Sequence, residues 1–236
     1  STAWSSASPL IATVSNAGVV SGIAAGTSVI TYMNTNGCTI TQTVTVNPRP
    51  TITGTATVCV GSTTTLTGSA TAHAITPWVS ATPAVATVSN TGVVTGVLAG
   101  TSVITYMNTN GCTQTQTVTV RANPTATIDN EATMCSESLA SSNLTITVVG
   151  GTAPYTATYT NPSAVPVGPT FAGTTFNITP LVVGNYTLTR IADVNGCFTN
   201  ITGQVSAISV HPDLVATPVS ATCAVTQVAT IVGTIS

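Results

Sequence analysis

The sequence carries one long segment twice, at a constant offset. Residues 4–46 recur as residues 78–120 without an insertion, so that Trp4 corresponds to Trp78 at an offset of 74 positions. A repeat of fixed period indicates tandem modules, each of which is one folding unit. We therefore expect modules of about this length, of which the first copy lacks its opening part.

Within the complete copy, polar and apolar residues alternate, which is the pattern of strands with one buried face. In residues 112–120, Cys112, Val118 and Val120 lie on one face, and the threonines at positions 113, 115, 117 and 119 form the other. Threonine suits an exposed strand face because its branched Cβ favours extended backbone and its hydroxyl tolerates water. The pattern predicts that this threonine face is exposed to solvent.

Turn residues fall between the alternating segments, at Ser89–Gly92 and at Asn110–Gly111. The strands predicted in this copy are 51–58, 63–69, 84–88, 93–98, 101–108 and 112–120. Short strands with a turn about every eight to twelve residues are typical of the immunoglobulin-type β-sandwich. We predict an all-β chain of tandem immunoglobulin-like β-sandwich modules, arranged as an elongated array.

Charged side chains are nearly absent, which excludes several functions. Three arginines and five acidic residues occur among 236 residues, and the net charge is −2. Such a chain cannot neutralise a nucleic-acid backbone or bind an anionic membrane through a basic patch. Hydrophobic residues make up 43% of the chain, which is enough for a buried core. No apolar run reaches the roughly 18–20 residues of a spanning helix, so we expect no membrane insertion.

The residues from Pro83 to Tyr106, PAVATVSNTGVVTGVLAGTSVITY, resemble the second group of bacterial immunoglobulin-like domains. That family occurs in tandem in surface adhesins and intimins, and the resemblance covers residues 1–120. The phrase TNGCT at 109–113 is similar to versions of these domains in very large surface proteins of Bacteroidota. The resemblance implies a secreted or cell-surface protein, exported by the type nine route.

Residues 122–212 resemble a related but different group. The segments GGTAPY at 150–155, GNYTLT at 184–189 and DVNGC at 193–197 are similar to PKD-like and gliding-adhesin repeats. The expected division is an incomplete immunoglobulin-like module at 1–46, a complete one at 47–121, a divergent immunoglobulin-like or PKD-like module at 122–212, and the opening strands of a further module at 213–236.

Six cysteines without a CxxC pair favour disulfides in an oxidising, extracellular compartment over a metal site. Each complete module has an early and a late cysteine. We therefore predict one bridge from Cys59 to Cys112 and another from Cys135 to Cys197. In the chain-entropy model, a bridge that closes a loop of this length contributes about 4 kcal/mol.

Cys38 and Cys223 have no partner of this kind. Counted by the repeat, the partner of Cys38 falls before residue 1 and that of Cys223 falls after residue 236. The explanation that we favour is an excerpt from a longer array. The other is that residues 223–236 of one chain supply the opening strands that the module at residue 1 of another chain lacks. Both cysteines are candidates for inter-module or inter-chain disulfides.

The sequence offers no catalytic constellation. His73 and His211 are far apart in the chain without a shared acidic neighbour, and neither GxSxG nor SxxK occurs. We expect no enzymatic activity, no catalytic residue and no cofactor. Residues 129–131 and 193–195 could jointly bind calcium, but an Asx-type turn and a hairpin tip are the favoured interpretation, because each cluster has few carboxylates.

Two functional hypotheses remain. In the first, the modules are spacers in the stalk or filament of an adhesin, because sandwiches of short strands add length for few residues. In the second, residues 122–212 bind a glycan or protein receptor through the segment 161–175, the longest candidate loop. Trp4 and Trp78 are interpreted as core side chains and not as carbohydrate platforms.

The lack of charge also predicts association. In natural sheets, lysine and other charged residues at exposed edges prevent pairing with other chains. Residues 50–120 contain no charged side chain. We expect the partners to be other modules of the same long chain or other copies, packed into a fibre or a surface layer.

Overall fold

We describe the protein from a computed structural model, which covers residues 3–129, 132–135, 144–179, 182–211, 214–216 and 233–235. Every regular element in these ranges is a β-strand. Accordingly, no described segment forms a long apolar helix of the kind that spans a bilayer. The chain divides into two compact units, Ser1–Arg121 and Ala122–Ser236, and each is described by itself.

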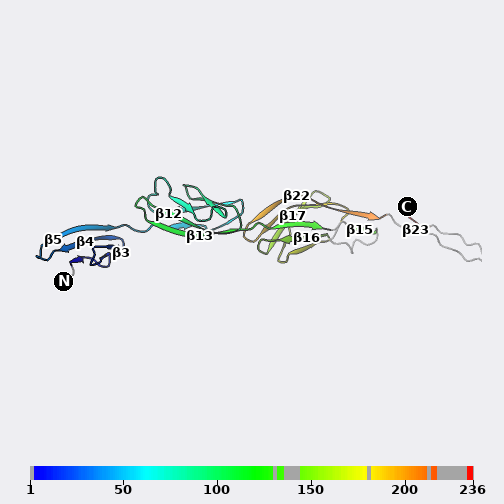
Figure 1. The fold of residues 1–236 in the computed structure, drawn as a ribbon. Helices are drawn as coiled ribbons and strands as arrows, with labels where there is room; N and C mark the ends of the chain where they lie inside the picture. The colour runs from blue at the N-terminus through cyan, green and yellow to red at the C-terminus, as the bar shows by residue number, and fades with distance from the viewer. Residues whose placement is uncertain are drawn as a thin grey trace, which may run out of the picture. The chain divides into compact units, whose positions relative to one another are not determined.

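Residues 47–121 form a sandwich of two sheets. One sheet has the strand order β10-β11-β8-β6 and the other the order β7-β13-β12-β9. The strands are β6 Ile52–Gly54, β7 Thr57–Cys59, β8 Thr63–Gly68, β9 Trp78–Ser80, β10 Ala86–Val88, β11 Val93–Gly96, β12 Gly100–Met107 and β13 Thr113–Arg121. The long hairpin β12–β13 can be followed in Figure 1. β7 runs parallel to β13, and the other pairs in this sandwich are antiparallel.

One core fills the space between these two sheets. Leu66 and Val94 from one sheet pack with Ile104 and Val118 from the other, and all four are at most 1% exposed. Trp78 joins the same core and is 7% exposed, which confirms its interpretation as a core side chain. Two sheets of short strands closed over a shared apolar core form an immunoglobulin-like sandwich.

β13 shows why these residues form strands. Its threonines at positions 113, 115 and 117 are exposed, whereas Val118 and Val120 are buried. The predicted threonine face is therefore confirmed along most of the strand, with Thr119 half-buried near its end. The period-two alternation places every apolar side chain of this strand on the core side of the sheet.

The strand predicted over 51–58 is wrong in one respect, because the chain changes sheets in the middle of it. β6 lies in one sheet and β7 in the other. The break falls at Gly54, which has a φ of +120°. A Cβ at this position would collide with the backbone carbonyl oxygen of Thr65, so the chain passes β8 closely here because residue 54 is glycine.

Residues 1–46 reproduce part of this sandwich. They form the sheets β1-β4-β5 and β2-β3, in the same pairings as β9-β12-β13 and β10-β11. The strands are β1 Trp4–Ser6, β2 Ala12–Val14, β3 Val20–Gly22, β4 Gly26–Met33 and β5 Thr39–Val46. Counterparts of β6, β7 and β8 are not found among the described residues of this segment.

The second unit is also a two-sheet structure. One sheet has the order β14-β16-β20, and the other has the order β15-β22-β21-β17-β18, with β19 also paired to β17. The strands are β14 Thr125–Asp129, β15 Ala132–Cys135, β16 Leu144–Val149, β17 Tyr155–Thr160, β18 Pro166–Val167, β19 Thr170–Phe171, β20 Thr175–Ile178, β21 Gly184–Asp193 and β22 Phe198–His211. A further short pair joins β23 Leu214–Ala216 to β24 Gly233–Ile235. Leu144, Ile146, Leu188 and Ile191 are completely buried and anchor one core between the two larger sheets.

The segment 161–175, expected to be a long loop, is tied to the sheet at two points. β18 and β19 both pair with β17, and the backbone N–H of Ala157 donates to the carbonyl oxygen of Pro169 at 3.1 Å. The prolines at positions 166 and 169 are compatible with this arrangement because an edge strand leaves some amides unpaired. The described chain is thus all-β and consists of tandem immunoglobulin-like sandwich modules.

Candidate functional sites: cysteine turns and an aromatic pocket

The β12–β13 hairpin ends in a turn that holds a cysteine in a defined position. The Oδ1 atom of Asn108 accepts hydrogen bonds from the backbone N–H groups of Asn110 and Cys112, both at 3.0 Å. Gly111 has a φ of +76°, which glycine adopts without strain. This is an Asx turn, in which a short polar side chain replaces backbone hydrogen-bond acceptors.

The same turn occurs in each of the other two modules. The Oδ1 atom of Asn34 accepts from the N–H of Cys38 at 2.9 Å, and the Oδ1 atom of Asp193 accepts from the N–H of Cys197 at 2.9 Å. The glycine before each cysteine also has a positive φ, +81° and +80°. The shared pattern is Asn or Asp, any residue, Asn, Gly and Cys. We call these three segments the cysteine turns: residues 34–38, 108–112 and 193–197.

Each complete module carries its cysteine turn beside its own opening segment. In residues 47–121, the N–H of Thr109 donates to the carbonyl oxygen of Thr71 at 2.9 Å. Two residues before Thr71, the N–H of Ser69 donates to the carbonyl oxygen of Thr51, also at 2.9 Å. In the second unit, the Oδ2 atom of Asp193 accepts from the N–H of Thr152 at 3.0 Å. The neighbouring Gly151 is packed against Pro124.

The structure corrects the predicted bridge between Cys59 and Cys112. Cys112 is a free thiol, and Cys59 is disulfide-bonded. Cys59 lies opposite Arg121 at the end of β13, whereas Cys112 immediately precedes its first residue. At about 3.3 Å per residue, the length of β13 separates the two cysteines by roughly 30 Å. A disulfide needs Cα atoms within about 7 Å.

The predicted bridge between Cys135 and Cys197 fails for the same reason. In the parallel pair of β15 and β22, Cys135 lies opposite His211, the last residue of β22. Cys197 directly precedes the first residue of that strand, so roughly 40 Å of extended chain lies between the two backbone positions. Cys197 itself is disulfide-bonded and completely buried. Cys223 lies outside the described residues, and Cys38 is an exposed free thiol.

The carboxylate of the cluster at 193–195 stabilises the turn through hydrogen bonds. Asp193 is 7% exposed, and its two carboxylate oxygens accept from three backbone N–H groups, those of Thr152, Asn195 and Cys197. This matches the interpretation as an Asx turn. Of the other cluster, 129–131, only Asp129 is among the described residues. Across the described part of the chain, no three histidine, cysteine or acidic side chains lie together as metal ligands would.

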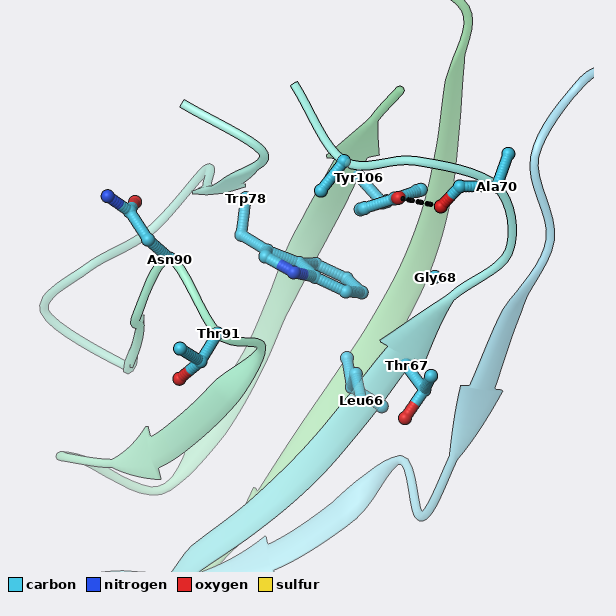
Figure 2. Close-up of a pocket in the computed structure, with 9 residues that line it drawn as sticks. Leu66, Thr67, Gly68, Ala70, Trp78, Asn90, Thr91 and Tyr106 are labelled. Carbon is cyan, nitrogen blue, oxygen red and sulfur yellow. Dashed lines mark hydrogen bonds between the residues drawn. The ribbon is translucent and has the colours of Figure 1, made fainter. Parts of the chain in front are cut away.

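A pocket of about 250 Å³ opens in residues 47–121 beside the aromatic pair Trp78 and Tyr106. Figure 2 shows the indole of Trp78 crossing the pocket between Leu66 and the turn that carries Thr91. The two rings have centroids 4.7 Å apart at an angle of 45°. The hydroxyl of Tyr106 donates to the carbonyl oxygen of Ala70 at 3.0 Å, which fixes the ring. The pattern of the sequence did not reveal this pocket.

The pocket offers surfaces for packing and few groups for chemistry. Besides the two aromatic rings, its lining consists of Leu66, Thr67, Gly68, Ala70, Ala72, Asn90 and Thr91. None of these is a general acid, a general base or an activated nucleophile. His73 lies nearby in sequence, but its Nδ1 atom accepts from the N–H groups of Ile75 and Thr76 at 3.4 and 3.3 Å. His211 is the last residue of β22, and its backbone lies opposite Cys135 in β15.

No family model and no curated protein matches this chain. Among solved structures, it is similar to domains 4–9 of the surface layer protein SbsC, with 18% identity over 92% of this chain and 40% of that chain and a TM-score of 0.21. It is also similar to domains 4 and 5 of the S-layer protein SbsC, with 17% identity over 76% of this chain and 88% of that one and a TM-score of 0.28. A three-domain immunoglobulin structure of titin has 12% identity over 79% and 74% of the two chains and a TM-score of 0.32. This chain spans less than half the length of the first of these. Likenesses at these scores carry no argument about function.

Proposed function

We propose that this chain is a structural segment of the stalk or filament of a secreted or cell-surface bacterial adhesin, and that copies assemble by strand complementation. The observation that carries the proposal is the pair of strand edges, on β3 and β5, that stay unpaired among the described residues. In residues 47–121, β11 pairs with β8 and β13 pairs with β7. The corresponding edges of β3 and β5 have no such partner among the described residues.

Corresponding residues show how much apolar surface the open edges leave uncovered. Val20 is 37% exposed, whereas Val94 at the equivalent position is completely buried. Tyr32 is half-buried, whereas Tyr106 is 2% exposed. Unpaired strand edges and uncovered apolar side chains favour pairing with another segment. A half-sandwich of this kind is suited to assembly.

The donor that we propose is the segment 213–236 of a second copy. In sequence, Ala221-Thr-Cys223 is matched with Thr57-Val-Cys59 at an offset of 164 positions, and Ile231-Val-Gly233 is matched with Leu66-Thr-Gly68 at an offset of 165 positions. A segment donated to an open strand edge supplies affinity through backbone hydrogen bonds, and its alternate side chains fill the core.

The rest of the molecule supports a mechanical role outside the cell. The described titratable side chains do not gather around the pocket, whose lining has no acid or base. Strand faces that carry threonine, as in β13, are exposed to solvent and uncharged. The disulfide-bonded state of Cys59 and Cys197 is typical of proteins in an oxidising compartment, which supports secretion.

Sedimentation of the full chain over a concentration series tests this function, with a variant that ends at residue 212 as the comparison. We expect concentration-dependent oligomers of the full chain under reducing conditions and a monomeric truncated variant. A synthetic peptide of residues 213–236 should shorten the oligomers, because it occupies the acceptor edges. A full chain that stays monomeric at high concentration, or a truncated variant that assembles equally, would contradict the proposal.

Receptor binding by residues 122–212 is the alternative, and it has less support. The segment 161–175 is held to β17 at two points, β18 and β19, and the pocket beside Trp78 lies in residues 47–121 instead. A glycan array probed with the full chain separates the two functions. Specific binding that survives deletion of residues 213–236 would favour a receptor-binding module, and no binding favours the structural segment.

A further inference from the structure

We propose that the edge of β3 accepts only one kind of strand, in which a glycine follows a large apolar residue by two positions, and that Tyr32 is the residue that requires the glycine. The strand comes from a second copy of this chain, and in this respect the inference rests on the proposed function. What it adds is the sequence that a donated strand must have. Residues 47–121 show the physical reason, because they contain the same site with its strand in place.

β8 is the strand that occupies this site in residues 47–121. It pairs antiparallel with β11, and the backbone N–H of Leu66 donates to the carbonyl oxygen of Gly92 at 2.9 Å. The side chain of Leu66 is 1% exposed and belongs to the core between the two sheets. A strand added to a sheet edge binds through its backbone, and its alternate side chains determine which sequences fit. Leu66 is therefore the first determinant of fit.

Gly68 is the second determinant. It lies two positions after Leu66 and thus on the same face of the strand. A Cβ at position 68 would collide with the aromatic ring of Tyr106. Gly68 is not among the glycines with a positive φ, so its backbone conformation is open to other residues. The close approach of the ring is what requires glycine here.

The ring of Tyr106 is held in place and cannot turn aside for a methyl group. Its hydroxyl donates to the carbonyl oxygen of Ala70 at 3.0 Å, as Figure 2 shows. On the other side it packs against Trp78, with ring centroids 4.7 Å apart. Ala70 lies two residues after Gly68, so the strand that the ring restricts also supplies the acceptor for its hydroxyl.

Residues 1–46 have the same receiving geometry, although no strand covers it among the described residues. The rings of Trp4 and Tyr32 have centroids 4.8 Å apart at 48°, close to the 4.7 Å and 45° of the complete module. Gly18 has a φ of +80°, compared with +83° for Gly92. A site that already has its bound geometry loses little free energy to reorganisation when a strand binds. The site is therefore preformed.

The core positions around this site are incompletely covered. Val44 and Val46 are half-buried, whereas Val118 and Val120 at the equivalent positions are at most 2% exposed. A large apolar side chain at the Leu66 position of an incoming strand would cover this surface. Two residues later, any Cβ would meet the ring of Tyr32, as it would meet that of Tyr106 in the complete module.

The test uses a fluorescently labelled peptide of residues 51–70, in which serine replaces Cys59 to prevent disulfide exchange. It is titrated with the full-length chain at concentrations at which the chain sediments as a monomer, and fluorescence anisotropy measures binding. A peptide with Gly68→Ala should bind about tenfold more weakly or worse, because overpacking a rigid site is strongly unfavourable. A peptide with Thr67→Ala is the control and should bind within about twofold of the parent peptide, because Thr67 is exposed.

Variants of the full-length chain identify the residue that requires the glycine. Tyr32→Ala removes the ring, so the parent and Gly68→Ala peptides should bind it with similar affinity. Tyr32→Phe keeps the ring and should keep the full difference between the peptides. Val29→Thr changes an exposed residue on the other face of β4 and should leave both affinities unchanged. If Tyr32→Ala does not fold, the comparison of the two peptides on the parent chain and on Tyr32→Phe remains decisive.

The outcomes separate this inference from the proposed function. Equal binding of the parent and Gly68→Ala peptides by the parent chain would overturn the glycine requirement and leave strand donation intact. A difference that persists in a folded Tyr32→Ala variant would overturn the role of Tyr32. If no peptide binds although the full chain forms oligomers, a strand like β8 is not the occupant and the inference fails. If the peptides bind as expected but the full chain stays monomeric at every concentration, the selectivity of β3 stands and donation by a second copy fails.

Discussion

The Oδ1 atom of Asn108 accepts a hydrogen bond from the backbone N–H of Cys112, and this contact closes the turn that presents the cysteine. Asn108 is 1% exposed, so its loss leaves two backbone donors without this acceptor. We predict that Asn108→Ala destabilises the sandwich of residues 47–121 by about 2 kcal/mol. Urea unfolding followed by tryptophan fluorescence measures this directly, because both tryptophans lie in the first unit.

Asn110 provides the control for this prediction. It lies in the same turn but is exposed, and its contribution to the turn is through its backbone N–H. The free energy of unfolding of an Asn110→Ala variant should lie within about 0.5 kcal/mol of that of the parent chain. Equal losses for both variants would show that the side-chain oxygen of Asn108 does not hold the turn.

Gly92 and Gly111 allow conformational strain to be separated from steric collision. Both have a positive φ, +83° and +76°. A Cβ at Gly92 would meet the carbonyl oxygen of Leu66 and, at 3.2 Å, the indole of Trp78, whereas a Cβ at Gly111 would meet nothing within 4 Å. We predict that Gly111→Ala lowers the free energy of unfolding by about 1 kcal/mol and that Gly92→Ala lowers it clearly more. Equal losses in urea unfolding would exclude the close approach at Gly92.

The same substitution should lower the stability by different amounts in the two copies of the repeat. Val94→Ala should cost about 2 kcal/mol because Val94 is completely buried, whereas Val20→Ala should cost little in the monomer because Val20 is 37% exposed. In oligomers, Val20→Ala should weaken association, since the donated strand covers that position. Sedimentation of the variant checks this, and unchanged association would show that β3 does not accept a strand.

Burial raises the pKa of the Tyr159 hydroxyl above its ordinary value of 10.0, and the neighbouring Tyr186 adds to the shift. The folded state therefore holds this proton more tightly than the unfolded state. The stability that Tyr159 contributes is complete below pH 10 and is lost as the pH rises through its folded pKa. We expect a Tyr159→Phe variant to lose less stability than the parent chain between neutral and strongly alkaline pH, as measured by urea unfolding at each pH. A parallel decline of both proteins would contradict the raised pKa.

Local patterns carried most of what could be predicted of the fold. The alternation in residues 112–120 identified the exposed threonine face, and the turn residues at 89–92 and 110–111 placed the hairpins. Both features depend on neighbours in sequence, for which period-two patterning is informative. The strand β9 was not predicted because three residues are too few to show a period. The change of sheet at Gly54 was missed because its cause is contact with Thr65, in another strand.

The cysteine pairs could not be predicted from spacing because they depend on strand direction. Cys59 and Cys112 belong to one module, but the parallel pairing of β7 with β13 places them at opposite ends. An antiparallel pairing of the same two strands would have brought them to the same end. The role of Asn34 and Asn108 was also missed, although their common spacing of four residues before a cysteine was visible in the sequence.

Electron microscopy of the full-length protein, assembled at high concentration under oxidising conditions, tests the central claim most directly. Strands of about eight residues make sandwiches roughly 30–40 Å long. We predict unbranched rows of beads at this spacing, which continue over many copies and are absent from preparations that end at residue 212. Isolated particles of one chain, or compact aggregates without a repeating spacing, would contradict the account.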